Sequence, residues 1–166
     1  FHQFGVVEMG MRGKGQIEHL TRLAEPDVAV VVNAGTAHIE LLGSTDAIAE
    51  AKSEIWLGLR DGGTIVRPVD DARIEAHARA HRPRARHVTF GDNSGDVSLL
   101  EYRPHDAGST IVIDAFGARY PLELHLVGKH VAIDACAALA AAHAAGGSRW
   151  AARSASQTAE RAGARV

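Results

Sequence analysis

The chain has 166 residues, of which 46% are hydrophobic and 5% aromatic, as is typical of one globular domain. Its 18 Lys and Arg residues and 20 Asp and Glu residues give a formal net charge of −2. This balance argues against a nucleic-acid-binding protein, because a polyanion attracts an excess of positive charge. The single cysteine, Cys136, excludes an intramolecular disulfide framework and a cysteine-rich zinc site. No apolar run approaches the ~18 residues of a membrane span and no signal peptide is visible, so we expect no membrane insertion.

The first ninety residues alternate between two hydrophobic patterns. Short apolar runs such as Val28–Val32 are typical of strands buried in a parallel sheet, whereas 16–25 repeats apolar residues at helical spacing. Ser44 is suited to cap a further helix. We therefore expect strands at 4–9, 28–32, 64–69 and 87–90, and helices at 16–25, 45–59 and 72–80.

The pattern changes after Gly91. Residues 97–102, 110–115 and 120–126 predict three strands with no helix between them, and an alanine-rich helix is expected at 129–145. The predicted fold is α/β, a doubly wound and mostly parallel sheet with a small antiparallel β meander. We place this domain at residues 1–146 and expect the Ala-, Arg- and Ser-rich tail, 147–166, to be peripheral or disordered.

Two polar residues follow expected strands. Glu8 stands at the end of the first strand, and His38 lies in the segment after the second. Ligands of doubly wound sheets bind beyond the carboxyl ends of the strands, so both residues are candidates for a Mg²⁺ or phosphate site. A solvated glutamate and a structural histidine are the alternatives.

Lys52 occupies an unusual place in the expected helix 45–59. It lies between Ile48 and Ile55, on or beside the apolar face. Either its amine reaches the solvent along a packed stem, or it extends over the ligand crevice. Glu50 and Glu54, on the same helix, are expected to be solvated.

Polar residues also stand at two other helix starts. His130 and Asp134 lie one turn apart at the start of the alanine-rich helix, where backbone N–H groups favour polar ligands; ordinary capping is the alternative. Asp70 and Asp71 precede the helix at 72, and an N-cap is the favoured interpretation. The remaining histidines are expected at the surface.

Four short motifs, in this order and spacing, resemble the central domain of the Mur ligases. They are Glu8-Met9-Gly10, the segment 33–40 (Asn-Ala-Gly-Thr-Ala-His-Ile-Glu), Gly43-Ser44 and the segment 51–55 (Ala-Lys-Ser-Glu-Ile). The resemblance extends over about residues 4–145. The Glu-Met-Gly form of the first motif resembles that of the family branch whose members add D-Ala-D-Ala.

The resemblance implies an ATP-dependent ligase of peptidoglycan precursor synthesis in the cytoplasm. Such an enzyme phosphorylates the terminal carboxylate of UDP-MurNAc-tripeptide, and the amine of D-Ala-D-Ala then attacks the acyl phosphate. The implied cofactors are ATP and Mg²⁺. The cations hold a triphosphate against a carboxylate, which would otherwise repel each other.

The motifs also imply residue roles. Glu8 and His38 match the family's Mg²⁺ ligands, and Lys52 matches a lysine that becomes carbamylated. His130 and Asp134 match a Gly-x-His-x-x-x-Asn helix start beside the adenine. Asp134 replaces the family's Asn, which exchanges an amide donor for an acceptor, and Pro68 replaces the Asn of an Asn-x-Asp-Asp motif.

A phosphate-binding Gly-x-x-Gly-Lys-Thr loop precedes the Glu-Met-Gly strand in the family, and no Gly-Lys-[Ser/Thr] loop occurs in this chain. We therefore expect the chain alone to be inactive and, with a sheet edge left unpaired, to associate with itself. The alternative functions are a non-catalytic α/β module that binds a nucleotide-sugar or a partner, or another Mur- or folylpolyglutamate-type amide ligase.

Overall fold

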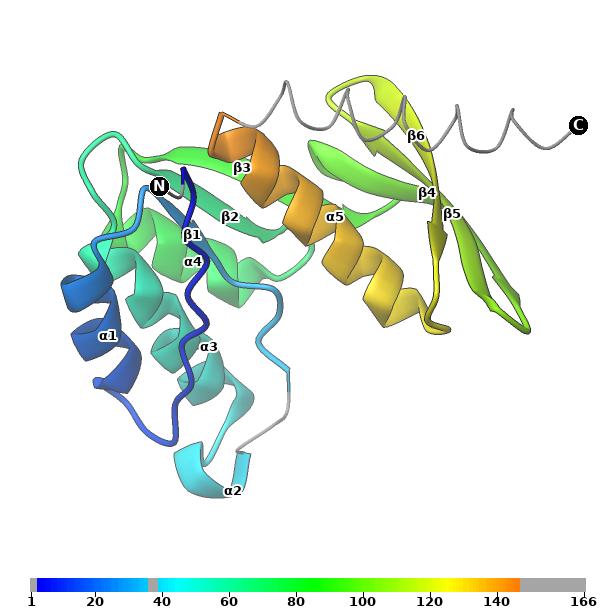
Figure 1. Cartoon of the computed structure of the whole chain (residues 1–166). Coiled ribbons are helices and arrows are strands. Elements are labelled where there is room, and N and C mark those ends of the chain that lie inside the picture. Colours follow the sequence, from blue (N-terminus) through cyan, green and yellow to red (C-terminus); the bar gives the residue numbers. More distant parts are fainter. Residues whose placement is uncertain (1–2, 36–38, 147–166) are drawn as a thin grey trace, which may run out of the picture. The chain divides into compact units, whose positions relative to one another are not determined.

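The computed structural model describes residues 3–35 and 39–146 (Figure 1). Helices and strands alternate in the first half, and strands follow one another before the last helix. Their bounds are α1 Gln16–Ala24, β1 Val28–Val30, α2 Ile39–Leu42, α3 Thr45–Ser53, the 3₁₀ helix η1 Glu54–Gly58, β2 Thr64–Pro68, α4 Ala72–His81, β3 Arg86–Asp92, β4 Val97–His105, β5 Gly108–Ala115, β6 Ala118–Leu124 and α5 Lys129–Ala144.

The six strands belong to one mixed sheet in the order β1-β2-β3-β4-β5-β6. β3 and β4 pair in parallel, whereas β4 with β5 and β5 with β6 pair antiparallel, which confirms the predicted meander. The four-residue link between β3 and β4 is held by Asp96, whose carboxylate accepts hydrogen bonds from the backbone N and the hydroxyl of Thr89, both at 2.8 Å. The connection is far shorter than the roughly dozen residues that usually join parallel strands.

The chain divides into two compact units, and the first comprises Phe1–Ile65 and Asp71–Arg86. Its core forms around Trp56, which is fully buried and donates its indole N–H to the carbonyl of Ala29 at 3.4 Å. Small and branched apolar side chains from β1, α3, β2, α4 and the segments that follow β1 and η1 surround it, namely Ala29, Val31, Ala34, Ala49, Leu59, Ile65, Ile74 and Ala78. Burial of these side chains holds the helices of this unit together.

The second unit comprises Val66–Asp70 and His87–Val166. In it, α5 packs against β4 and β5. Alternate residues of β5 are buried, as expected for a strand with one side on the core. The buried face of α5 is made of Ala132, Cys136, Ala137 and Ala140, whose small side chains let the helix lie close to the sheet.

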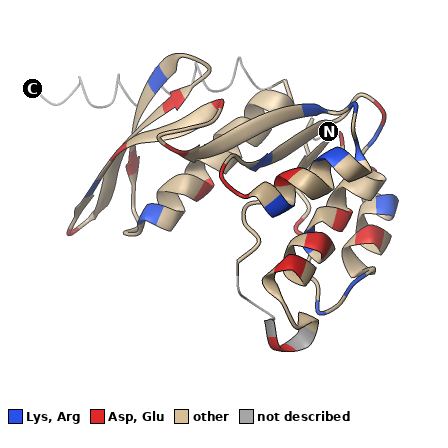
Figure 2. Ribbon diagram, turned by 180° about the vertical axis from the view of Figure 1, so that it is seen from behind, with Lys and Arg blue, Asp and Glu red and all other residues tan. Residues whose placement is uncertain are grey.

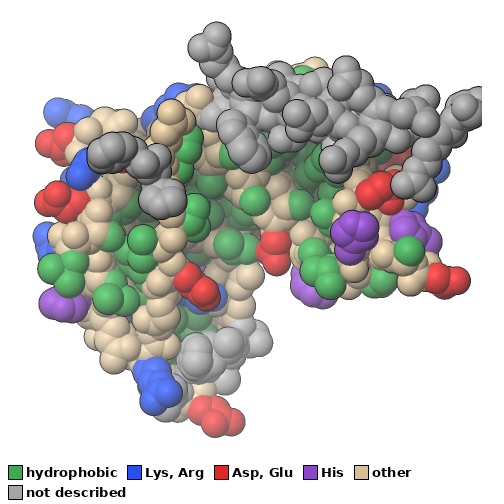
Figure 3. Space-filling model, viewed as in Figure 1, with side chains coloured by type: hydrophobic (Ala, Val, Ile, Leu, Met, Phe, Trp, Pro, Cys, Tyr) green, Lys and Arg blue, Asp and Glu red, His purple; other side chains and the backbone are tan. Residues whose placement is uncertain are grey.

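The strand expected at 4–9 is wrong. These residues are coil, shown in dark blue at the front of Figure 1, and Val6 and Val7 are 100% and 66% exposed. Within the described residues no strand pairs with this segment, and an unpaired segment cannot satisfy its backbone hydrogen-bonding groups as a strand. Figure 3 shows hydrophobic side chains at the surface on the same side of the molecule.

The other expected elements are confirmed with shifted ends. β1 ends at Val30, and the helix expected at 45–59 changes from α to 3₁₀ geometry at Glu54. On α1, Leu23 is exposed, because the face packed on η1 carries Ile17 and Thr21 instead. The expected tail, 147–166, lies outside the described residues.

Lys and Arg are interspersed with Asp and Glu along the helices of the first unit (Figure 2). This mixture agrees with the near-neutral charge of the sequence. Within residues 3–35 and 39–146, no helix is both long and apolar enough to cross a membrane.

Candidate functional site

The helix that carries Lys52 begins at a side-chain cap. The hydroxyl of Ser44 accepts a hydrogen bond from the backbone N of Ala47 at 3.1 Å, as the sequence predicted. Ile48, Ala49 and Ala51 are buried on the inner side of α3. This packing fixes the direction in which Lys52 leaves the helix.

Lys52 joins α3 to the segment that follows β1. Its Nζ donates to the backbone carbonyl of Asn33 at 2.8 Å and lies 3.4 Å from the Asn33 Oδ1. The side chain is half-buried, and this burial lowers the pKa of the Lys52 amine below its ordinary value. The amine is therefore held in place rather than extended freely into solvent, and burial raises its neutral fraction above that of an ordinary lysine.

The structure describes one of the two predicted metal ligands. Glu8 lies in the exposed coil rather than at a strand end, and His38 lies outside the described residues. Among the described residues, no group of three or more His, Cys, Asp and Glu is placed to hold a metal ion. Glu8 and Lys52 supply the donor types that Mg²⁺ accepts, provided that the lysine becomes an anion, but they do not form a ready-made centre.

The expectation that the two carboxylates beside Lys52 are solvated is wrong for Glu54. Glu54 is only 8% exposed, and its oxygens accept hydrogen bonds from the backbone N of Gly15 at 2.7 Å and of Glu18 at 3.2 Å. The Glu50 side chain is 46% exposed, as expected, and forms an ion pair with Lys14 at the surface. A usable signal was present in the sequence: α1 starts after Gly15, which has no side chain to cap it.

The predicted nucleotide residues lie at the start of α5. His130 and Asp134 are both exposed. The His130 ring lies over Gly128, where an added Cβ would be 2.5 Å from the His130 Cε1. Gly128 has φ 139° and donates its backbone N–H to the hydroxyl of Tyr102 at 2.8 Å. A glycine is therefore needed here for the backbone angle and for the space that the imidazole occupies.

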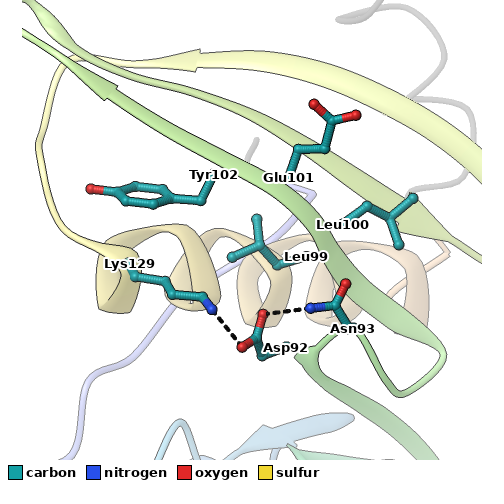
Figure 4. A pocket seen from close by; sticks show the side chains of 7 residues that line it. All are labelled: Asp92, Asn93, Leu99, Leu100, Glu101, Tyr102 and Lys129. Atoms are coloured by element: carbon teal, nitrogen blue, oxygen red, sulfur yellow. Dashed lines mark hydrogen bonds and ion pairs between the residues drawn. The ribbon is translucent and has the colours of Figure 1, made fainter.

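A shallow pocket of about 160 Å³ opens beside the same helix start (Figure 4). The Nζ of Lys129 and the carboxylate of Asp92 form an ion pair at 2.6 Å, and the amide of Asn93 donates to the same carboxylate at 3.2 Å. The pocket is lined by Asp92, Asn93, Leu99, Leu100, Glu101, Tyr102 and Lys129. Neither His130 nor Asp134 is among these residues, so the two residues predicted to contact adenine do not line this pocket.

The Asp70–Asp71 pair has the capping role that the sequence favoured. Asp71 accepts from the backbone N of Arg73 at 3.0 Å and of Ile74 at 3.3 Å, and it forms an ion pair with the Arg73 guanidinium. Burial alone would raise the pKa of Asp71, but these hydrogen bonds and the adjacent positive charge outweigh it and lower the pKa. Asp70 is exposed.

Comparison with known proteins identifies relatives of nearly the whole described chain. Residues 2–142 match the model of the Mur ligase middle domain family. The UDP-N-acetylmuramoyl-tripeptide–D-alanyl-D-alanine ligase of Bacillus subtilis is 35% identical over 140 residues, which are 84% of this chain and 29% of that protein.

Solved structures show the same likeness. A crystal structure of MurF from Acinetobacter baumannii superimposes with a TM-score of 0.81 and 30% identity, over 87% of this chain and 32% of that one. MurF ligase from Thermotoga maritima, solved in complex with ADP, gives 0.71 and 29% identity, over 84% and 32%. The neighbours bear out the α/β fold with a mixed sheet, and the chain spans less than a third of the length of these relatives.

Proposed function

Because the chain belongs to the Mur ligase family through its middle domain, we propose that it is the central domain of a ligase that adds D-Ala-D-Ala to UDP-MurNAc-tripeptide. The observation that carries this proposal is the hydrogen bond from Lys52 to Asn33, which joins two of the family-like motifs in space. We place the domain at residues 1–146 and the enzyme in the cytoplasm, and we propose no nucleic-acid partner.

The proposed reaction has two balanced steps. The terminal carboxylate of the tripeptide attacks the γ-phosphorus of ATP, which releases ADP and leaves an acyl phosphate. The neutral amine of D-Ala-D-Ala then attacks the acyl carbon, the C–O bond to phosphate breaks, and inorganic phosphate and a proton leave. Bound Mg²⁺ would supply the positive charge that the phosphates need, and Glu8, His38 and a modified Lys52 would hold it.

Lys52 is suited to the proposed carbamylation. A neutral amine attacks CO₂ and loses one proton, so that an ammonium becomes a carbamate anion. The lowered pKa of Lys52 raises the neutral fraction that this step requires. The carbamate nitrogen retains one N–H, which can still donate to the carbonyl of Asn33, so the link seen in the structure can survive the modification.

We propose that His130 and Asp134 border the adenine of ATP. Their support is the position at a helix start and the open surface that both side chains face. A carboxylate at 134 accepts hydrogen bonds but cannot donate one, so it fits the exocyclic amino group of adenine better than the ring nitrogens.

The experiment uses the complete ligase of which this chain is the proposed central domain. It is incubated with UDP-MurNAc-tripeptide, D-Ala-D-Ala, ATP and Mg²⁺, and the pentapeptide product is measured by mass spectrometry. Product formation with one phosphate released per amide bond supports the proposal. Its absence, together with binding of the nucleotide-sugar, would favour the non-catalytic binding module instead.

A further inference from the structure

The buried carboxylate of Glu54 caps a helix to which it does not belong. Its two oxygens accept the backbone N–H groups of Gly15 and Glu18, which are the N-cap and the third residue of α1. These groups have no partner within a helix and carry its positive dipole end. A carboxylate that is 8% exposed is thereby satisfied by two charge-assisted hydrogen bonds.

Two further contacts attach the loop before α1, and α1 itself, to α3 and η1. Glu50, one turn before Glu54, forms the ion pair with Lys14. The hydroxyl of Thr21 donates to the carbonyl of Ile55 at 2.7 Å. Together with Glu54 these contacts fix the glycine-rich loop 10–15 and the first turns of α1 on one helical segment.

Lys52 lies between the two carboxylates in sequence and extends to a different loop. Its Nζ donates a hydrogen bond to the backbone carbonyl of Asn33, in the segment that follows β1. The segment 50–54 therefore holds two loops at once, one that follows Glu8 and one that leads to position 38. All of these contacts lie within the first compact unit.

We propose that Glu54 is a positioning residue for the cation-binding end of the site, acting by fixing the loop after Glu8 relative to Lys52. This inference rests on the proposed ligase function. Loss of the cap leaves two N–H groups at the start of α1 without their acceptor, and the loop is no longer tied to the helix that carries the lysine. Residues that orient metal ligands change metal affinity by about 10- to 100-fold when removed.

The test compares Glu54→Ala and Glu54→Gln with Glu18→Gln in the complete ligase. Glu18 is a matched control because its side chain pairs with Arg22 on the outer side of α1. Mn²⁺ binding is measured by electron paramagnetic resonance with ATP present, and the Mg²⁺ dependence of turnover is measured in parallel. We expect Glu54→Ala to weaken Mn²⁺ binding about tenfold or more, and we expect high Mg²⁺ concentrations to restore most of its kcat. The Mn²⁺ affinity of Glu54→Gln should lie between those of Glu54→Ala and the wild type. The Glu18→Gln variant should match the wild type in both measurements.

Unchanged Mn²⁺ affinity in a folded Glu54→Ala variant would overturn the proposal and leave Glu54 as a structural brace. If Glu54→Ala fails to fold, the milder Glu54→Gln variant decides by the same binding measurement. Failure of the ligase function is distinguished by the wild type, which would form no pentapeptide whatever the Mn²⁺ affinity of the variants.

Discussion

The Nζ of Lys52 lies 2.8 Å from the backbone carbonyl oxygen of Asn33. The contact joins the middle of α3 to the segment after β1, and both ends belong to motifs similar to those of the Mur ligases. Burial disfavours the ammonium form and lowers the pKa of the Lys52 amine, whereas the contact with the carbonyl needs only an N–H donor, which both the ammonium and the neutral amine provide.

The first prediction concerns the titration of that amine. In the folded chain, Lys52 should titrate below the ordinary lysine value of about 10.4, because burial lowers its pKa. The same chain in urea should show the ordinary value. NMR of selectively labelled lysine, with Lys52→Arg to assign the signal, measures both states. An ordinary pKa in the folded chain would contradict the account.

The cap of α4 gives a second prediction. Asp71→Ala removes the acceptor for two backbone N–H groups and should lower the free energy of unfolding by about 0.5–2 kcal/mol at neutral pH. Because the pKa of Asp71 is lowered in the folded state, its contribution is present above the unfolded pKa of about 4 and is lost as pH falls through the folded value.

Asp70→Ala is the matched control for this cap, because Asp70 is exposed and stands next to Asp71. Urea denaturation of the two variants at pH 7 and at pH 3 measures the difference. Equal losses of stability for Asp70→Ala and Asp71→Ala at pH 7 would show that the cap is not the cause.

The close approach of α1 and η1 gives a third prediction. A Cβ at Gly58 would lie 2.3 Å from the backbone oxygen of Thr21, so Gly58→Ala must push the two helices apart. We expect a loss of about 1–3 kcal/mol in the free energy of unfolding, the usual cost of overpacking. Gly13→Ala, where nothing lies within 4 Å of the added Cβ, should change little in the same denaturation experiment.

Much of the fold could be predicted from the hydrophobic pattern. The β-branched run at 28–32, the cap at Ser44 and the alternation along β5 each specify a local structure, and these elements formed where expected. The segment 4–9 shows the limit of such reasoning. Its hydrophobic pattern indicates a strand. A strand also needs a neighbouring strand to pair with, and the pattern of these six residues says nothing about whether such a neighbour is present.

The candidate site was less accessible from the sequence. The position of Lys52 between apolar residues did indicate an amine in an unusual environment. The role of Glu54 could not be read from its own helix, because its partners are backbone N–H groups of α1, 36 and 39 residues away in the chain. Gly15 indicates that α1 lacks a side-chain cap of its own, but backbone groups leave no side-chain signature, so only the structure shows that Glu54 is the residue that supplies the cap.

A fourth prediction concerns association of the 166-residue chain. Val6 and Val7 are exposed in the coil before α1, and the edge strand β6 carries Pro121, which disfavours pairing at that end of the sheet. We expect the chain to self-associate through its N-terminal apolar segment, and Val6→Lys with Val7→Lys to reduce this association. Light scattering across a wide concentration range measures it, and a monomer at all concentrations would refute the prediction.

The most direct test of the central claim is the turnover of the complete ligase with Lys52→Ala, measured as pentapeptide formed from UDP-MurNAc-tripeptide and D-Ala-D-Ala. The account predicts the loss of most activity, no recovery with bicarbonate, and partial recovery with acetate, a small carboxylate able to occupy the vacated space. Lys52→Arg, which keeps a cation but cannot form the lysine carbamate, should be equally impaired. Wild-type turnover in Lys52→Ala would contradict the assignment of Lys52 to the reacting site.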